Sequence, residues 1–301
     1  MTFEYAFVPH YLDLEGLRYH YLDEGPRDAD TEVVVMVHGN PSWSYLYRNL
    51  VPKLSDRFRT IVPDHIGCGN SDKPGDADYP YTLARRVADL GSLIDALGLS
   101  RVHLVVHDWG GMIGTTWAVQ NPDRVLSLTA MNTSAFHLPT TKPLPFTIGL
   151  ARTPGIGALM VRGLSAFSRG ANRYCVTRAP MQREVAEGFL QPYDSWQNRI
   201  AVHRFVQDIP LEPEHPSWNL VSETQDHLNR LAAVPMLFCW GMRDFVFDHH
   251  FLDEWVKRFP HAEVHRFEDA GHYLLEDAGD EVYPLVRGFL LGQAISAGAE
   301  S

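Results

Sequence analysis

Cysteine is scarce in this sequence, and its pattern excludes two kinds of small structural framework. The 301 residues include three cysteines, Cys68, Cys175 and Cys239, which lie far apart and form no C-x-x-C pair. A disulfide framework or a zinc site is therefore not expected, and this cysteine usage fits the reducing environment of the cytoplasm. The sequence predicts no metal and no cofactor.

Long apolar runs are also lacking. No uncharged apolar segment reaches the roughly 18 residues that a membrane-spanning helix requires. The nearest candidate, residues 143–167, is interrupted by Arg152, Arg162 and several proline and glycine residues. Residues 1–16 show no basic segment followed by an apolar run, so we expect no signal peptide. These absences predict a cytoplasmic protein without a membrane span.

Positive charge is in deficit along the chain. The sequence has 26 Lys and Arg against 37 Asp and Glu, for a formal net charge of −11, and no run of basic residues. Proteins that bind nucleic acid need a basic surface for the phosphate backbone, so the charge argues against nucleic acid as a partner. Hydrophobic residues make up 45% of the chain and charged residues 21%, which is typical of a globular protein with a large core.

Short apolar runs alternate with helical patterns over most of the chain. Helices are expected at 82–99 and 111–125, where apolar residues recur at helical spacing. Strands alternating with helices predict an α/β fold, with a mostly parallel sheet and helices on both faces. The expected strands lie at 33–39, at the start of 58–72, and at 102–106, 125–133, 235–241 and 262–272.

The pattern changes between residues 135 and 216. This region is rich in proline, arginine and aromatic residues, has a helical pattern at 194–209 and shows no clear strand. Ligands of parallel sheets bind outside the carboxyl ends of the strands, so a helical insertion there would form a lid. The sequence therefore predicts a core in two parts, 1–134 and 217–301, with a helical cap at 135–216.

The segment VHDWG at 106–110 follows the third expected strand and precedes a helix. A nucleophile elbow has this arrangement, with the reactive side chain exposed on a sharp strand-to-helix turn. Asp108 occupies the nucleophile position, and Gly110 with Gly111 would allow the tight turn. An aspartate before a helix can also be a simple N-cap, so this reading depends on finding partner residues elsewhere.

The expected partners are a histidine and an acid that follow later strands. In this fold the order along the chain is nucleophile, acid, histidine. His272 comes just after the last expected strand, and Asp244 lies a few residues past the strand at 235–241. Asp248 is the fallback acid, although a helix cap explains it better. Asn132 occupies the other possible acid position, but an amide cannot be a charged partner.

The loop after the first expected strand should supply stabilising donors. Asn40 can point an amide N–H into the site, and Trp109 can donate its indole N–H. Such donors stabilise negative charge on a departing group. His38 is expected to hold the loop through hydrogen bonds, and residues 64–72 to form a glycine-shaped turn.

An aspartate nucleophile limits the chemistry. Its ordinary pKa of about 3.9 leaves it ionised at neutral pH without a base. A carboxylate suits displacement at an alkyl carbon, which gives an alkyl ester that water activated by His272 and Asp244 can cleave. Asp108 therefore fits a carbon–halogen bond, an epoxide or a strained lactone better than an ordinary ester.

These same segments resemble a known superfamily over nearly the whole chain. HGNPSWSYLYRNL, VPDHIGCGNSDKP, VVHDWGGMIG, WGMRDFVFD and EDAGHYLLED are similar to the α/β-hydrolases, specifically their haloalkane dehalogenase branch. In that branch the residues at the positions of Asn40 and Trp109 bind halide. Epoxide hydrolases share the aspartate elbow but usually read H-G-F-P and use lid tyrosines, for which Tyr174 and Tyr193 are the candidates here.

Within this branch the lid is most similar to the β-lactone decarboxylases of bacterial long-chain olefin biosynthesis. The resemblance implies conversion of a cis-3,4-dialkyl-β-lactone to a cis-alkene and CO₂, and association with other enzymes of that pathway. The alternative is a haloalkane dehalogenase, and a catalytically silent binding module is a third class. Asp108 would attack either the β-carbon or the carbonyl of the lactone, and the residues do not choose between these routes. An apolar lid at 144–167 would suit a substrate with two alkyl arms.

Overall fold

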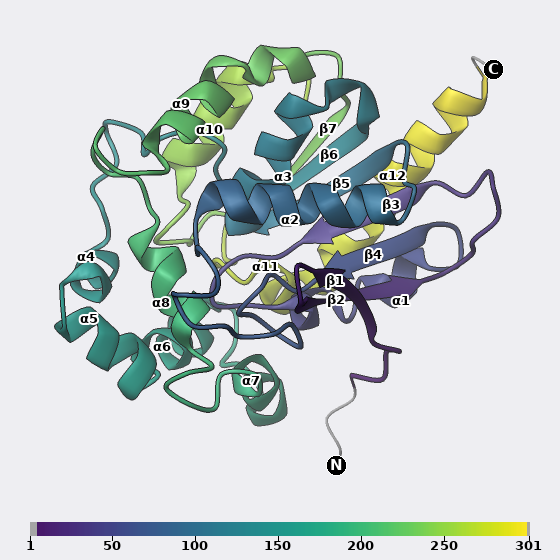
Figure 1. Cartoon of the computed structure of the whole chain (residues 1–301). Coiled ribbons are helices and arrows are strands. Elements are labelled where there is room, and N and C mark those ends of the chain that lie inside the picture. The colour runs from purple at the N-terminus through teal and green to yellow at the C-terminus, as the bar shows by residue number, and fades with distance from the viewer. Residues whose placement is uncertain (1–4, 300–301) are drawn as a thin grey trace.

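The computed structural model describes residues 5–299, with side chains up to residue 294 (Figure 1). One eight-stranded sheet has the order β1-β2-β4-β3-β5-β6-β7-β8. The pairs from β4 through β3 to β8 are parallel, whereas β1 pairs antiparallel with β2 and β2 with β4. The strands are β1 His10–Leu14, β2 Leu17–Glu24, β3 Val33–Val37, β4 Arg59–Pro63, β5 Val102–Asp108, β6 Val125–Thr133, β7 Met236–Gly241 and β8 Glu263–Phe267.

Helices cover both faces of the sheet, as predicted. In Figure 1, α2 lies in front of the strands and α12 behind them; α3 packs on β3, β5 and β6, and α12 on β6 and β7. The α-helices are α1 Val51–Leu54, α2 Leu83–Ala96, α3 Trp109–Gln120, α4 Phe146–Arg152, α5 Ile156–Ala158, α6 Ala166–Tyr174, α7 Arg183–Leu190, α8 Ile200–Gln207, α9 Trp218–Asp226, α10 His249–Arg258, α11 Leu274–Asp277 and α12 Gly279–Ala299. The short 3₁₀ helices are η1 Ser44–Tyr47, η2 Pro122–Arg124 and η4 Leu228–Leu231, and η3 Leu159–Gly163 is a π-helical turn.

The central strands form the core because they are apolar on both faces. Every residue of β3, β5 and β7 is buried, and the expected strand at 125–133 coincides with β6. All six strands expected from apolar runs are present. The hairpin of β1 and β2 was not expected, because its half-exposed strands mix charged and apolar residues. It turns at Glu15 and Gly16, which both have positive φ.

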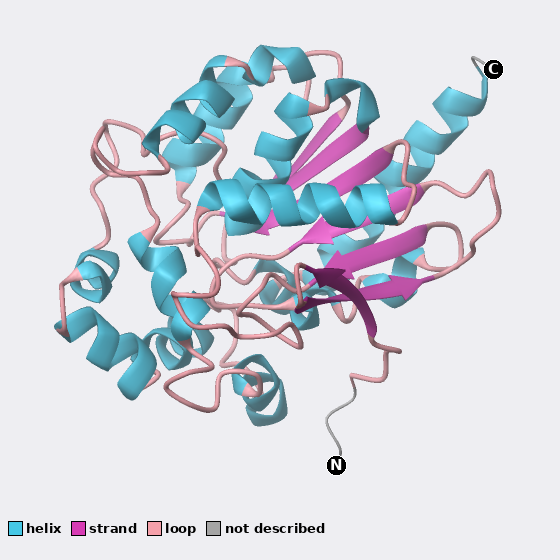
Figure 2. Cartoon of the chain, in the orientation of Figure 1, coloured by secondary structure: helices cyan, strands magenta, loops and turns pink. Residues whose placement is uncertain are grey.

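The helices α4 to α8, with η3 and their connecting loops, are called the cap here. Figure 2 shows only helices and loops in this part, and the arrows of the central strands point toward it. The expected helix at 194–209 was too long, since only residues 200–207 are α-helical. Side chains of Asp194 and Ser195 bond to Asn198 and hold the preceding residues in a turn instead. Among the described residues, no helix is both long and apolar enough to cross a bilayer.

Candidate active site

Asp108 stands on a strained turn between β5 and α3. Its φ of 53° and ψ of −128° lie in a region that residues with a side chain rarely adopt. Glycines let neighbouring backbone approach this turn. A Cβ on Gly39 would lie 2.0 Å from Oδ1 of Asp108, and one on Gly110 would lie 1.9 Å from the carbonyl oxygen of Val37. The turn has the nucleophile-elbow geometry that the sequence predicted.

Backbone amides hold the carboxylate of Asp108. The N–H of Asn40 donates to Oδ1 at 2.5 Å, and the N–H of Trp109 also bonds to the carboxylate. The hydroxyl of Thr133 bonds to the carbonyl oxygen of Asp108 and fixes the turn from β6. The backbone N–H groups of Asn40 and Trp109 thus stabilise negative charge on the carboxyl group of Asp108.

The side chains of Asn40 and Trp109 both line the space above Asp108. Nδ2 of Asn40 donates to the carbonyl oxygen of Val202 in α8 at 3.2 Å, so one amide hydrogen links the loop to the cap. A primary amide has a second hydrogen, which is available to a ligand. The indole of Trp109 packs against Phe205 with a centroid distance of 5.4 Å.

His272 connects Asp108 to Asp244, as the sequence predicted. Nδ1 of His272 lies 2.7 Å from Oδ2 of Asp244, and Nε2 lies 3.6 Å from Oδ2 of Asp108. All three side chains are buried; Asp108 ends β5, and Asp244 and His272 lie in the loops that follow β7 and β8. His107 steadies the histidine, because its Nε2 lies 2.8 Å from the carbonyl oxygen of His272. The imidazole is thus fixed between two carboxyl groups.

Burial and mutual charge set the protonation of this group. Burial raises the pKa of Asp108 to about 6, although the charge of His272 and the two backbone N–H groups act against this rise. Burial also lowers the pKa of His272, but the charge of Asp244, its hydrogen bond and the charge of Asp108 outweigh it, so that pKa is raised. Asp108 is therefore ionised at neutral pH, and the two carboxylates favour the cationic form of the imidazole between them.

Asn132 contributes to the site in a way that the sequence did not predict. Its Nδ2 donates to Oδ2 of Asp244 at 3.0 Å and to the carbonyl oxygen of Gly241 at 3.0 Å. Its Oδ1 accepts from the N–H of Gly241 at 2.8 Å, and its φ is 36°. The sequence analysis considered Asn132 only as a charged partner, whereas its place at the end of β6 was the signal for a neutral donor to the acid.

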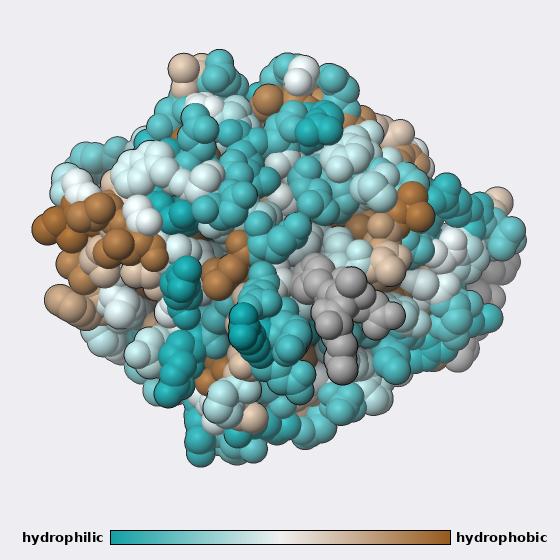
Figure 3. All heavy atoms as spheres, turned by 90° about the horizontal axis from the view of Figure 1, so that it is seen from below, coloured by the Kyte–Doolittle hydropathy of each residue, from teal (hydrophilic) through white to brown (hydrophobic). Residues whose placement is uncertain are grey.

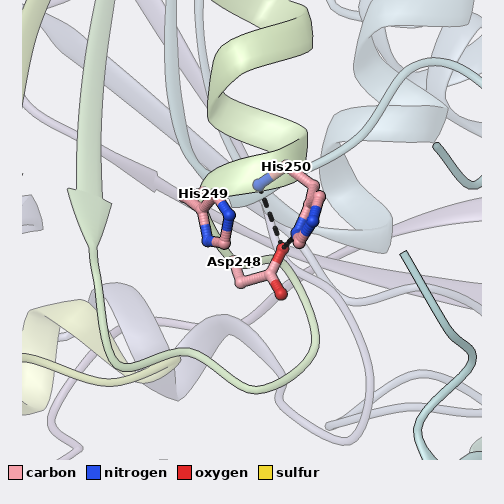
Figure 4. Close-up of side chains that lie close together, drawn as sticks. All are labelled: Asp248, His249 and His250. Atoms are coloured by element: carbon pink, nitrogen blue, oxygen red, sulfur yellow. Dashed lines mark hydrogen bonds and ion pairs between the residues drawn. The ribbon is translucent and has the colours of Figure 1, made fainter. Parts of the chain in front are cut away.

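The fallback acid is used elsewhere. Oδ1 of Asp248 accepts from the N–H of His250 at 3.1 Å and caps α10, which confirms the helix-cap interpretation. Figure 4 shows this carboxylate with His249 and His250, whose ligand atoms lie close enough to hold a metal ion. However, the ammonium of Lys142 lies 2.6 Å from the same carboxylate. A cation already neutralises Asp248, which disfavours a metal site at this position.

The two loop predictions also hold. His38 lies with Nδ1 2.8 Å from the carbonyl oxygen of Gly39, and its Nε2 accepts from the N–H of His65. Asp64 accepts from the N–H groups of Ser44 and Asn70, so the 64–72 loop is shaped by its own hydrogen bonds. These residues support the site without entering it.

The two lid tyrosines do not converge on Asp108. Tyr174 lines the cavity above the site but is 66% exposed. Tyr193 is buried and donates its hydroxyl to the carbonyl oxygen of Ser42 at 2.9 Å. The paired tyrosines that an epoxide hydrolase would need are therefore not in place.

A cavity of about 310 Å³ lies between the core and the cap. Asn40, Asp108, Trp109 and His272 form its polar end. The rest of its wall is almost entirely apolar, which suits a substrate with hydrocarbon arms. Side chains of this wall include Leu144, Ile148, Met160, Phe167, Val206, Val221 and Phe251.

The chain matches one family model, described as the alpha/beta hydrolase fold, over residues 32–152 and 182–279. Among solved structures, a loop variant of a haloalkane dehalogenase from Bradyrhizobium elkanii superposes with a TM-score of 0.86 at 26% identity. The match covers 98% of this chain and 100% of that one. The fold of the whole chain is thus the fold of a haloalkane dehalogenase.

Three curated proteins are about half identical to this chain. A cis-3-alkyl-4-alkyloxetan-2-one decarboxylase from Shewanella oneidensis is 51% identical over 94% of this chain and 88% of its own length. A protein of the same name from Xanthomonas campestris is 48% identical, over 95% of this chain and 97% of its own. A haloalkane dehalogenase from Psychrobacter cryohalolentis is 46% identical, over 95% and 93%. Other dehalogenases are 29–33% identical.

Proposed function

This chain belongs to the alpha/beta hydrolase fold family, and from that premise we propose that it is a decarboxylase of cis-3,4-dialkyl-β-lactones. The products are a cis-alkene and CO₂. One observation carries the proposal: an aspartate elbow lies at the polar end of an apolar cavity, in a chain about half identical to two such decarboxylases along almost its whole length.

In the proposed reaction, the carboxylate of Asp108 attacks the β-carbon of the lactone. The bond from that carbon to the ring oxygen breaks with inversion, and the ring oxygen becomes part of a free carboxylate. The bond to this carboxylate then breaks, its electron pair forms the alkene, and the ester bond to Asp108 breaks in the anti sense. Inversion followed by anti elimination gives the cis-alkene, and no water or proton is consumed.

The neighbouring residues are assigned roles by their position. Asn40 and Trp109 hold the released carboxylate where a dehalogenase holds halide. His272 stabilises negative charge beside Asp108, because its pKa is raised and Nε2 is 3.6 Å away. Asp244 orients His272 through the 2.7 Å bond to Nδ1.

The second route is attack of Asp108 on the lactone carbonyl, which opens the ring to an anhydride with a free β-hydroxyl group. Water activated by His272 would hydrolyse this anhydride to a β-hydroxy acid, so this route releases no alkene. Turnover in H₂¹⁸O separates the routes. Attack at the β-carbon leaves the peptide containing Asp108 unlabelled after many turnovers. Mass spectrometry that finds ¹⁸O in this carboxyl group, together with a β-hydroxy acid whose β-carbon keeps the configuration of the lactone, would establish the carbonyl route. Hydrolysis of an ester formed at the β-carbon would give the inverted alcohol instead.

Three further points belong to the same proposal. We assign residues 135–216 to a cap domain inserted into a core formed by 1–134 and 217–301. We place the protein in the cytoplasm, in association with other enzymes of olefin synthesis. Failure to co-purify with neighbouring pathway proteins from the native cell would argue against this association.

The first experiment is incubation with a long-chain cis-β-lactone, followed by gas chromatography, with Asp108→Ala as the blank. Alkene that depends on Asp108 supports the decarboxylase. The relative named haloalkane dehalogenase at 46% identity favours a second candidate, so halide release from 1-bromoalkanes is measured in parallel. Halide without alkene would replace the proposal with dehalogenase activity. Binding of either compound without turnover would indicate a binding module.

A further inference from the structure

Large apolar side chains gather on the outer surface of the cap. Phe146 is 82% exposed, and Ile156, Leu159 and Leu164 are 52%, 57% and 64% exposed. They lie on α4, α5, η3 and the turn after η3, which pack against one another in sequence. Figure 3 shows brown side chains clustered at the left, where α4 and α5 lie in Figure 1. Contiguous exposed apolar surface of this kind marks an interaction site.

The same part of the chain carries positive charge only. No Asp or Glu occurs between residues 134 and 183, in a chain whose net charge is −11. Surface of this composition, basic and apolar together, matches a membrane with anionic headgroups. The basic residues of the stretch are Lys142, Arg152, Arg162, Arg169, Arg173, Arg178 and Arg183.

Two of these cations remain available for a ligand. Lys142, Arg178 and Arg183 form ion pairs with acidic side chains, and Arg152 and Arg162 donate to backbone carbonyl groups. Arg169 and Arg173 are exposed on α6, four residues apart. Within residues 5–294, neither has an acidic partner at ion-pair distance.

The cavity opens beside this surface. Tyr174, at the end of α6, lines the cavity and is 66% exposed, and Phe245 lines it and is 41% exposed. The cavity wall also includes Pro145 and Thr147, which flank the exposed Phe146 in the sequence. A ligand that enters here passes over the apolar side chains of the cap.

We propose that this docking face, formed by Phe146, Ile156, Leu159, Leu164, Arg169 and Arg173, binds the surface of an anionic lipid bilayer. The apolar side chains insert among the acyl chains, and the two arginines contact lipid phosphates. Substrate then passes from the bilayer into the cavity without crossing water. The passage of substrate rests on the proposed function, because it is the lactone with two alkyl arms that partitions into lipid. The docking of the protein on the bilayer does not rest on that function.

A second copy of the chain fits the docking face less well. In a symmetric dimer the same surface meets itself, which would place the arginines of both copies in one interface, and residues 134–183 supply no acidic side chain to pair with them. Anionic lipid supplies the opposite charge, so it is the occupant that this composition favours.

Vesicle flotation tests the proposal. The wild-type chain is expected to float with phosphatidylglycerol–phosphatidylcholine vesicles at low salt, and much less with phosphatidylcholine alone. Arg169→Gln with Arg173→Gln should weaken binding to the anionic vesicles roughly thirtyfold, since each basic residue near such a surface strengthens binding about fivefold. Phe146→Asp with Leu159→Asp should abolish flotation. Two matched controls, Val8→Asp and Arg57→Gln with Arg101→Gln, alter exposed residues elsewhere and should float like the wild type.

Catalysis provides the separate readout. With detergent-dispersed lactone, the docking-face variants should retain wild-type turnover, because none of the four substituted side chains lines the cavity. A wild type that floats but makes no alkene would refute the proposed function and leave docking intact. Equal flotation of wild type and docking-face variants would overturn the docking proposal. The docking proposal would also be overturned if the wild type failed to float but self-associated in sedimentation, and Phe146→Asp with Leu159→Asp removed this self-association. That result would assign the face to a second copy of the chain.

Discussion

At the scale of single residues, Asp108 combines a strained backbone with a buried charge. Its pKa of about 6 in the folded chain lies above the ordinary 3.8, so the folded state holds this proton more tightly than the unfolded chain. The resulting stability is fully present below about pH 4 and is lost as the pH rises through about 6. An ionised Asp108 thus destabilises the fold at the pH where it serves as nucleophile.

Asp108→Asn is therefore expected to abolish turnover and to stabilise the protein at pH 7.5. The rise of the Asp108 pKa to about 6 corresponds to about 3 kcal/mol, of which about 1–2 kcal/mol should remain because His272 also loses an attractive charge. Urea unfolding at pH 7.5 and pH 4 checks this, with no gain expected at pH 4. The same gain at both pH values, or wild-type turnover by protein whose mass still shows Asn, would contradict the assignment.

Asn132 is expected to act on the reaction through Asp244. Its amide donates to a charged acceptor, and such bonds contribute about 1.5–3 kcal/mol. Asn132→Ala should therefore lower kcat by roughly 10- to 100-fold, with little change in KM because Asn132 does not line the cavity. Initial rates across substrate concentration measure this split.

Two controls separate this effect from simple destabilisation. Asn132→Gly also lacks the amide but accepts the φ of 36° more easily, so it should be more stable than Asn132→Ala and equally slow. Asn121→Ala removes a similar side-chain bond, to the carbonyl oxygen of Trp117, and should leave kcat unchanged. Recovery of kcat in Asn132→Gly would mean that backbone strain, and not the amide, explains the loss.

At the scale of elements, the turn from β5 to α3 depends on close approach to β3. A Cβ on Gly110 would lie 1.9 Å from the carbonyl oxygen of Val37 and 2.9 Å from that of His38. Gly110→Ala is therefore expected to destabilise the protein by about 1–3 kcal/mol or more, since backbone must move to admit the methyl group. It should also lower turnover by displacing Asp108.

Gly288 in α12 is the matched control for this change, because a Cβ there meets nothing within 4 Å. Gly288→Ala should stabilise the protein by roughly 0.5–1 kcal/mol through helix propensity. Urea unfolding of both variants is the measurement. The two variants are expected to change the free energy of unfolding in opposite directions. If Gly110→Ala left it unchanged, α3 would not be held tightly against β3.

Prediction of elements from the sequence was limited by how much each element depends on distant contacts. Strands β3, β5, β6 and β7 are buried on both faces, so their apolar runs were visible in the sequence. The exposed positions of β1 mix with buried ones, and that hairpin was missed.

The same limit applies to the site. Asp108, Asp244 and His272 were identified because each follows a recognisable strand, and the structure brings them together. The bond from Asn40 to Val202 spans 162 residues, and no local pattern indicates it. Likewise the amide of Asn132 bonds to an acid 112 residues away.

At the scale of the whole molecule, the core supplies the reactive groups and the cap supplies most of the apolar wall. Burial of a methylene group contributes about 0.8 kcal/mol, or roughly fourfold in kcat/KM. Specificity should therefore rise with the length of the alkyl arms until the cavity is filled, and then level off. The position of that plateau is set by the cap and not by Asp108.

Gly170→Leu tests this separation of roles. Gly170 lines the cavity from α6, and a Cβ there meets nothing within 4 Å, so a leucine side chain can extend into space that an alkyl arm would fill. The variant should lose at least about tenfold in kcat/KM for the longest lactones, the equivalent of two buried methylene groups, while the shortest are unaffected. Gly288→Leu makes the same change far from the cavity and should leave the whole length profile intact. A uniform loss at every chain length would mean that the leucine disturbs Asp108 or the fold, whereas an unchanged profile would place the alkyl arms in another part of the cavity.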